Sequence, residues 1–541
     1  MSVGIADVAA VESTTRPAAG VRTRRWAAHL RGLIGLVGVA AAWELIGRLK
    51  LVGQGAFPSL SGIVAQLWRD RADYPTHVAA SVRAATIGFL IGNVIAIICA
   101  LIFQRFPTVE RLLRGVGLTL FSVPLIALVP VLLIAFSGTT PRIVLAALAV
   151  YYPTMMATLT GLRDVDARLC DFVLASGGSE RDVLLRVRLR AALPSVLSGL
   201  RVAAPAALLG VLLVEFGGGV RWGLGSYLLA SLGRALPTRI WGIGLVATAI
   251  AASAYGLFAW LGSRLASLGG RGSSTSVDIG PPKSAKGPLS VRIAVSAASA
   301  AVVLGFWAVT LRLLHTSPIV AKSPFGVVRY LATGPRGARA RHDLLRALGQ
   351  TLPTAFLGLA CGLLAALVLA ILFTLKPRIE RAVLPFALVT QTMPLPALTP
   401  LLVLVFGRGL MATLAVTTSV TFFPSLVTVA HGLSRAPQGP SDVVRSAGGS
   451  EALVLARVSL PNALPHLLTA ARLAAPRALL GVMIAEYLAT GRGIGNLLNT
   501  ARGRLDYGMI WSVAAVSVLV ALLITQFVTA AERLVWRHYQ R

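Results

Sequence analysis

DFVLASGGSERDVLLRVRLRAALP at residues 171–194 recurs, in altered form, as DVVRSAGGSEALVLARVSLPNALP at residues 442–465. The two stretches align without a gap at a constant offset of 271 residues. Both contain Gly-Gly-Ser-Glu and, further on, an arginine, a valine, a leucine and the triplet Ala-Leu-Pro. Self-similarity at a fixed period is the signature of a duplicated structural unit. We therefore expect each stretch to belong to one half of a repeated protein.

Each copy is a charged, amphipathic island between very apolar segments. The pattern predicts a short helix, a break at residues 177–178 or 448–449, and a second helix that starts near Ser179 or Ser450. A serine followed by an acidic residue suits a helix N-terminus, because the free N–H groups there need acceptors. An island of this kind between membrane spans has to lie in water. The same surface built twice is most simply a docking site for a two-fold partner.

This pattern resembles the EAA loop of ABC-importer permeases, with its acidic residue, two small residues, glycine, apolar residue and Leu-Pro. The second copy keeps Leu-Pro, whereas the first has Arg190 where proline is expected. Both copies have bulky pairs, Phe172-Val173 and Val443-Val444, in place of the small residues. By this resemblance, the residues that couple the chain to an ATPase are Asp171, Gly177, Gly178, Ser179, Glu180, Leu189, Pro194, Asp442, Gly448, Gly449, Ser450, Glu451, Leu460, Pro461 and Pro465.

A further pair of stretches extends the resemblance to the nitrate/sulfonate/taurine branch: VLLVEFGGGVRWGLGSYL at 211–228 and VMIAEYLATGRGIGNLL at 482–498. The resemblance implies two fused six-helix permease domains of the type I importer fold. It also implies two copies of a nucleotide-binding ATPase subunit as partners, one coupling helix in a groove of each, and an extracytoplasmic solute-binding protein that delivers a small solute. ATP with Mg²⁺ would be bound by those subunits, so this chain is expected to bind no cofactor.

The composition is that of a membrane protein. Hydrophobic residues make up 56% of the 541 residues and charged residues 13%, which is too apolar for a soluble globular chain of this length. In a chain surrounded by membrane lipid, the net charge of +31 is explained by cytoplasmic loops that are rich in arginine. No platform of alternating aromatic and basic residues is present, so we expect no nucleic-acid partner. The three cysteines lack metal-ligand spacing, and no metal site is expected.

Composition also divides the chain into domains. Residues 1–31 are polar and predict a cytoplasmic tail, and residues 266–288 are rich in Gly, Ser and Pro, which predicts a flexible linker. The first permease domain is then 32–265 and the second 289–541. Each is expected to be all-α with six spans of about 20 residues. The expected spans are near 32–49, 83–104, 115–136, 141–160, 198–217 and 241–262, and near 290–313, 353–375, 383–405, 409–430, 470–488 and 509–530.

An even number of spans in each half predicts that both halves have the same orientation, a parallel, pseudo-two-fold repeat. Arginines gather in the loops that would be cytoplasmic and are sparser on the other side. This positive-inside bias predicts a multi-pass protein of the plasma or inner membrane with both termini in the cytoplasm.

Glu215 and Glu486 occupy the same repeat position, near the outer end of each fifth span. A carboxylate inside a membrane is costly unless it is paired or functional. Two roles therefore stay open: lining the translocation path, or a structural pairing. The bulky apolar neighbours of Glu215 favour the structural role, whereas the surroundings of Glu486 favour the path.

Pro124 and Pro394 match each other in the third spans, where proline would kink the helix beside the path or simply pack against neighbours. The polar side chains beside them, Ser122, Gln391 and Thr392, are the best candidates for the polar lining of the path.

No phosphate-binding G-x-x-x-x-G-K-[ST] motif, G-x-S-x-G or H-E-x-x-H occurs in the sequence. The chain is therefore expected to be a transport subunit and not an enzyme. The main alternative is a secondary transporter with two six-span halves, driven by an ion gradient, since such proteins also contain repeats. That architecture does not require a charged island between the fourth and fifth spans of each half.

Overall fold

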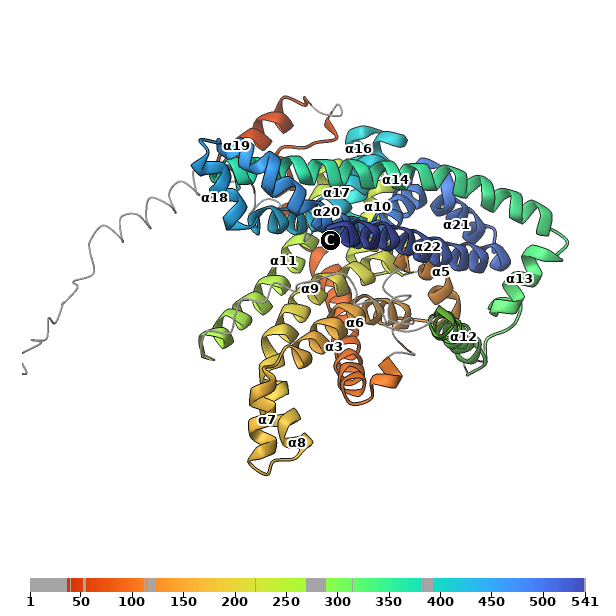
Figure 1. Cartoon of the computed structure of the whole chain (residues 1–541). Helices are drawn as coiled ribbons and strands as arrows, with labels where there is room; N and C mark the ends of the chain where they lie inside the picture. Colours follow the sequence, from red (N-terminus) through yellow and green to blue (C-terminus); the bar gives the residue numbers. More distant parts are fainter. Residues whose placement is uncertain are drawn as a thin grey trace, which may run out of the picture.

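The computed structural model describes residues 37–51, 55–110, 123–218, 220–268, 289–380 and 393–539, except Val39 and Leu314, together with Leu113 and Val383. Every regular element within these residues is a helix (Figure 1). The predicted tail at 1–31 and nearly all of the predicted linker lie outside them. The all-α fold is thus confirmed for the part of the chain that is described.

The first half contains the following helices in chain order. They are α2 (Leu60–Arg69), α3 (Tyr74–Arg105), α5 (Leu125–Ala135), α6 (Thr140–Arg163), α7 (Ala167–Ala175), α8 (Glu180–Asp182), the π-helical turn η2 (Val183–Arg188), α9 (Leu189–Phe216), α10 (Leu224–Gly233) and α11 (Pro237–Leu268).

The second half repeats this order. Its helices are α12 (Leu289–Leu313), α13 (Pro324–Ala332), α14 (Gly337–Leu375), α16 (Leu395–Phe406), α17 (Leu410–Ser434), α18 (Gln438–Ser446), α19 (Glu451–Val454), η3 (Leu455–Ser459), α20 (Leu460–Ala485), η4 (Glu486–Thr490), α21 (Gly493–Gly503) and α22 (Tyr507–Tyr539).

Eight helices among the described residues are long and apolar enough to cross a membrane, four in each half. They are α3, α6, α9 and α11, and α14, α17, α20 and α22. These match the predicted second, fourth, fifth and sixth spans. The helix α12 covers the span predicted at 290–313, and the span predicted at 32–49 is described only from Val37 onward.

The third predicted span of each half, 115–136 or 383–405, is wrong as a single helix. The helices α5 and α16 begin directly after Pro124 and Pro394, whose own backbones are extended. Proline lacks an N–H group, so it fits the start of a helix, where no intrahelical hydrogen bond is lost. These prolines therefore begin short helices, and they do not kink long ones.

The two halves are joined by an exchange of these short helices. The helix α5 packs on α20, α21 and α22, and α16 packs on α9, α10 and α11. We call the contact surface between the two halves the seam. In its core, Ile126 and Ala127 of α5 pack with Leu479 and Met483 of α20. Because lipid tails are as apolar as these side chains, close packing is what stabilises the seam.

Small residues bring the spans close together. A Cβ atom added at Gly88 or Gly92 of α3 would lie only 2.5 or 2.4 Å from side-chain atoms of Ala146 and Val150 on α6. The helix α20 similarly presents alanines to α14 and α22. Such contacts let backbones approach and increase dispersion attraction between helices.

One helix pair was not predicted. The loop after each fifth span leads into a short helix, α10 in the first half and α21 in the second. They lie between the fifth and sixth spans of each half. In Figure 1, α21 lies toward the opposite end of the second half from α18 and α19.

Candidate functional site

The first charged loop is a helix–turn–helix. The helix α7 ends at a turn in which Gly177 has φ +83°, a left-handed conformation that favours glycine. Ser179 then caps α8, because its Oγ accepts from the Asp182 N–H at 3.3 Å while Asp182 accepts from the Ser179 N–H at 3.0 Å. This reciprocal pair is a capping box. The predicted short helix, break and second helix are confirmed.

The second loop has the same backbone with different polar contacts. Gly448 has φ +81°, and Ser450 caps α19 by accepting from the Leu453 N–H at 3.3 Å. No acidic residue completes a capping box here. Arg445 instead donates to Glu451 at 2.8 Å and to Asp442 at 3.2 Å, which ties α18 to α19.

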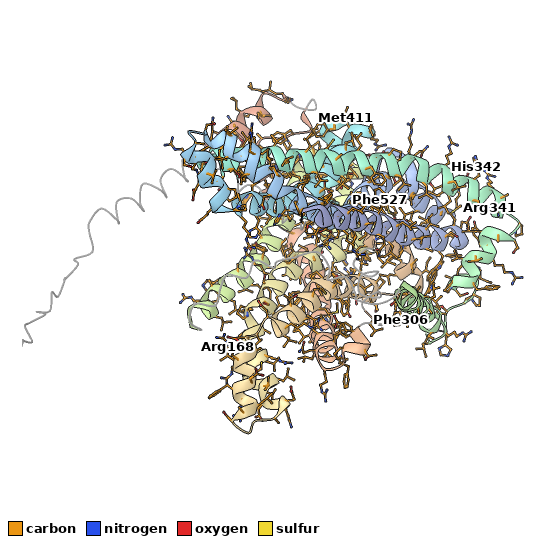
Figure 2. All side chains as sticks on the ribbon, in the orientation of Figure 1. Arg168, Phe306, Arg341, His342, Met411 and Phe527 are labelled. Atoms are coloured by element: carbon orange, nitrogen blue, oxygen red, sulfur yellow. The ribbon has the colours of Figure 1, made fainter. Side chains whose placement is uncertain are left out.

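Both loops expose an apolar side chain at the same repeat position. Phe172 is 71% exposed and Val443 is 67% exposed. The acidic residues before them, Asp171 and Asp442, are exposed as well. Figure 1 shows α7 and α8 projecting from the end of the first half, and Figure 2 shows the Arg168 side chain on that projection. Both loops therefore present the same pair of an acidic and an exposed apolar residue.

Each loop is continuous with a membrane span. After α8, the chain passes through η2 into α9, and after α19 it passes through η3 into α20, with no break between them. Leu189 and Leu460 are the first residues of the two spans, followed by Pro194 in one and by Pro461 and Pro465 in the other. A π-helical turn is a local irregularity that is frequent at functional sites. The second helix of each loop and the fifth span after it are therefore continuous.

Glu215 is fully buried near the C-terminal end of α9. Its carboxylate accepts from Ser81 Oγ of α3 at 2.8 Å, from the Gly225 N–H of α10 at 2.9 Å and from Arg142 Nη1 of α6 at 3.2 Å. Ser81 Oγ in turn accepts from the Leu224 N–H at 2.8 Å. The carboxylate thus fastens the start of α10 to three spans.

The second half repeats this arrangement without the cation. Glu486, 5% exposed, accepts from Thr351 Oγ1 of α14 at 2.8 Å and from the Gly495 N–H of α21 at 3.0 Å. Thr351 Oγ1 accepts from the Ile494 N–H at 2.9 Å. The residue that corresponds to Arg142 is Thr413, so this carboxylate has no ion-pair partner among the residues described.

Glycine is required where the short helices approach the glutamates. A Cβ atom added at Gly225 or Gly495 would lie 2.8 Å from the Cβ of Glu215 or Glu486. At Gly495 it would also lie 2.1 Å from the Met483 carbonyl oxygen. The contact leaves no room for a solute beside either carboxylate in this conformation.

The other path candidates are divided between the seam and the residues that are not described. Pro124 and Pro394 are buried at the starts of α5 and α16, the helices that cross between halves. Ser122, Gln391 and Thr392 lie outside the described residues. The walls of the seam include matching leucines, Leu209 of α9 and Leu480 of α20, packed against its core.

Sequence reasoning missed Ser81 and Thr351 because hydroxyl groups are common in membrane helices. Arg142 was not singled out from the sequence either. A search for charges inside apolar windows would have singled out Arg142, since ionisable residues there are expensive and usually paired or functional.

These features define a membrane transport protein made of two copies of one helical domain. The chain belongs to the family described as "Binding-protein-dependent transport system inner membrane component", which matches it twice, at residues 92–267 and 358–539. It is therefore a multi-pass inner-membrane transport component and not an enzyme. The two matches fit the predicted fusion of two permease domains.

Three relatives illustrate the similarity. A probable ABC transporter permease protein of Haemophilus influenzae is 28% identical over 166 residues, 31% of this chain and 68% of the relative. The formylaminopyrimidine transport permease ThiX of Halalkalibacterium halodurans is 32% identical over 148 residues, 27% of this chain and 59% of the relative. The taurine transport permease TauC of Escherichia coli is 28% identical over 248 residues, 46% of this chain and 90% of the relative. The last match shows that a near-complete relative corresponds to about half of this chain.

Proposed function

We propose that this chain forms the whole transmembrane part of an ATP-driven importer. One copy of a nucleotide-binding subunit docks at each of the loops 171–194 and 442–465, and binds ATP with Mg²⁺. An extracytoplasmic solute-binding protein delivers a small solute to the seam between the halves. The relatives, permease subunits of ABC transport systems, favour this proposal over a transporter driven by an ion gradient.

The observation that supports the proposal best is the duplicated helix–turn–helix, which exposes an apolar residue at a matching position, Phe172 or Val443, and runs without a break into a span. When two ATPase subunits close on nucleotide, the coupling helices move with them. Because α9 and α20 continue these loops, the spans that line the seam tilt as rigid bodies. The seam then opens to one side of the membrane and closes to the other, which is alternating access.

Phe172→Ala is expected to weaken binding of the ATPase subunit about ten- to hundredfold, since a buried phenylalanine contributes about 1.5–3 kcal/mol. The measurement is the apparent Kd of the purified nucleotide-binding subunit for the chain in nanodiscs. Phe527→Ala is the matched control, because Phe527 of α22 is 70% exposed but lies on a membrane span (Figure 2). Equal binding by wild type and Phe172→Ala would contradict docking at α7.

The proposed orientation is tested by cysteine labelling in a variant without Cys99, Cys170 and Cys361. Cysteines at Ser179 and Ser450 are expected to react with a membrane-impermeant maleimide only from the cytoplasmic side. The exposed positions Arg221 and Arg492, offset by the same 271 residues, are expected to react only from outside. Reaction of positions 179 and 450 from opposite sides would rule out a parallel repeat.

A further inference from the structure

Arg477 is an arginine inside a membrane span that lacks a protein partner. It lies in α20, is partly buried, and has no hydrogen-bond or ion-pair partner among the described residues. Three other arginines within the spans are paired. Arg142 contacts Glu215 at 3.2 Å, Arg472 contacts Glu532 at 3.2 Å, and the Arg201 guanidinium lies 4.1 Å from the ring centroid of Tyr255.

Its depth makes the missing partner significant. Arg477 precedes Glu486 by nine residues, which corresponds to about 14 Å along a helix with a rise of 1.5 Å per residue. A hydrocarbon layer is about 30 Å thick, so the side chain starts near its middle. A charge at that depth is expensive and faces the interior of the bundle or water, where it marks the route of a polar solute.

The face of α20 that contains Arg477 is the face that packs at the seam. Leu480 and Ile484 follow it by three and seven residues, so the three side chains lie on one stripe of the helix. Ile484 belongs to the core cluster that joins the two halves, and Leu480 packs against it. Arg477 therefore lies about one helical turn from the apolar side chain of Leu480. It is displaced toward the end of α20 that follows the loop 442–465.

The opposite wall has no matching charge. The offset of 271 residues places Ala206 of α9 at the position of Arg477. The stripe of Ala206 continues through Leu209 and Leu213, and these also pack in the seam cluster. The seam thus has an arginine on one wall, a methyl group on the other, and apolar side chains one turn further out.

We propose that Arg477 binds the anionic group of the transported solute, a small monovalent oxoanion such as a sulfonate or carboxylate, part-way through the membrane. The proposal rests on the proposed function, because it needs the seam to be the translocation path. A guanidinium presents planar, paired N–H donors that match two oxygens of such a group. Glu486 does not compete with the solute for Arg477, since the Glu486 carboxylate accepts hydrogen bonds from Thr351 and Gly495 at the far end of α20.

The test uses the full chain in detergent and needs neither the ATPase nor uptake, so its result is independent of the docking experiments. Methanesulfonate is the anionic probe and dimethyl sulfone, which has a similar shape, is the neutral one. A ligand that binds only the folded state raises the unfolding temperature with its concentration. At constant ionic strength, methanesulfonate is expected to stabilise wild type and dimethyl sulfone is not. Arg477→Ala is expected to raise the apparent Kd for methanesulfonate at least tenfold.

A relocated arginine provides the decisive comparison. In the double variant Arg477→Ala with Ala206→Arg, the cation stands on the other wall of the same pseudo-symmetric seam, and stabilisation by methanesulfonate is expected to return. Arg472→Ala, which removes a paired arginine of the same helix, is expected to keep the wild-type response. Equal stabilisation of wild type and Arg477→Ala by methanesulfonate, or equal stabilisation of wild type by the two probes, would overturn the proposal.

Discussion

Gly448→Val is expected to abolish ATP-driven uptake while the protein still inserts into the membrane. Gly448 has φ +81°, a region that costs an L-residue about 1–2 kcal/mol and a β-branched residue more. An added Cβ meets no atom within 4 Å, so the cost comes from the backbone conformation alone. The turn would relax by changing φ, which moves α19 relative to α18 and disrupts the docking surface. The measurement is uptake by proteoliposomes, normalised to the protein inserted.

Gly439→Val is the control, because Gly439 lies in α18 with open space around it and no positive φ. It is expected to keep most of the uptake.

Gly177→Val in the first loop is expected to be less severe than Gly448→Val, since the capping box of Ser179 and Asp182 holds α8 in place. That box is absent from the second loop, where Leu453 replaces the aspartate. Full uptake by Gly448→Val would contradict the requirement for a left-handed turn.

Glu215→Gln is expected to destabilise the protein by about 3–5 kcal/mol, the usual cost of removing one partner of a buried ion pair. Arg142, with a side chain 7% exposed, would be left as a buried cation without its counter-charge. Glu486→Gln is expected to cost much less, because glutamine can still accept from Thr351 or Gly495 and no arginine is left unpaired. The measurement is the unfolding midpoint of both variants in the same detergent.

A double variant distinguishes the loss of the ion pair between Arg142 and Glu215 from the loss of side-chain packing. Arg142→Met with Glu215→Gln removes both charges and keeps the volume, so much of the stability is expected to return. The difference between Glu215→Gln and Glu486→Gln decides between the two roles that stayed open for the carboxylates. Equal midpoints for wild type and Glu215→Gln would show that the ion pair does not stabilise the fold.

The repeat, the eight long apolar helices and both helix–turn–helix loops were readable from the sequence, because their signals are local. A run of about 20 apolar residues reports a span wherever it occurs. Gly177 and Gly448 occupy left-handed turns, and Ser179 and Ser450 cap the helices that follow, within four residues of one another in each loop. Local signals failed at Pro124 and Pro394, since a proline inside an apolar run is compatible with a kink or with a helix start.

The surroundings of the buried charges were decided only by the tertiary structure. Ser81 precedes Glu215 by 134 residues and Thr351 precedes Glu486 by 135, so no pattern along the chain brings them together. The sequence placed the two glutamates at the same repeat position, yet only the packing of α6 on α9 shows that one faces Arg142 and the other does not. The reason is physical. Hydropathy determines which segments enter the membrane, whereas the rotation of each helix about its axis depends on how its small and large side chains fit against its neighbours. That rotation decides which polar groups meet.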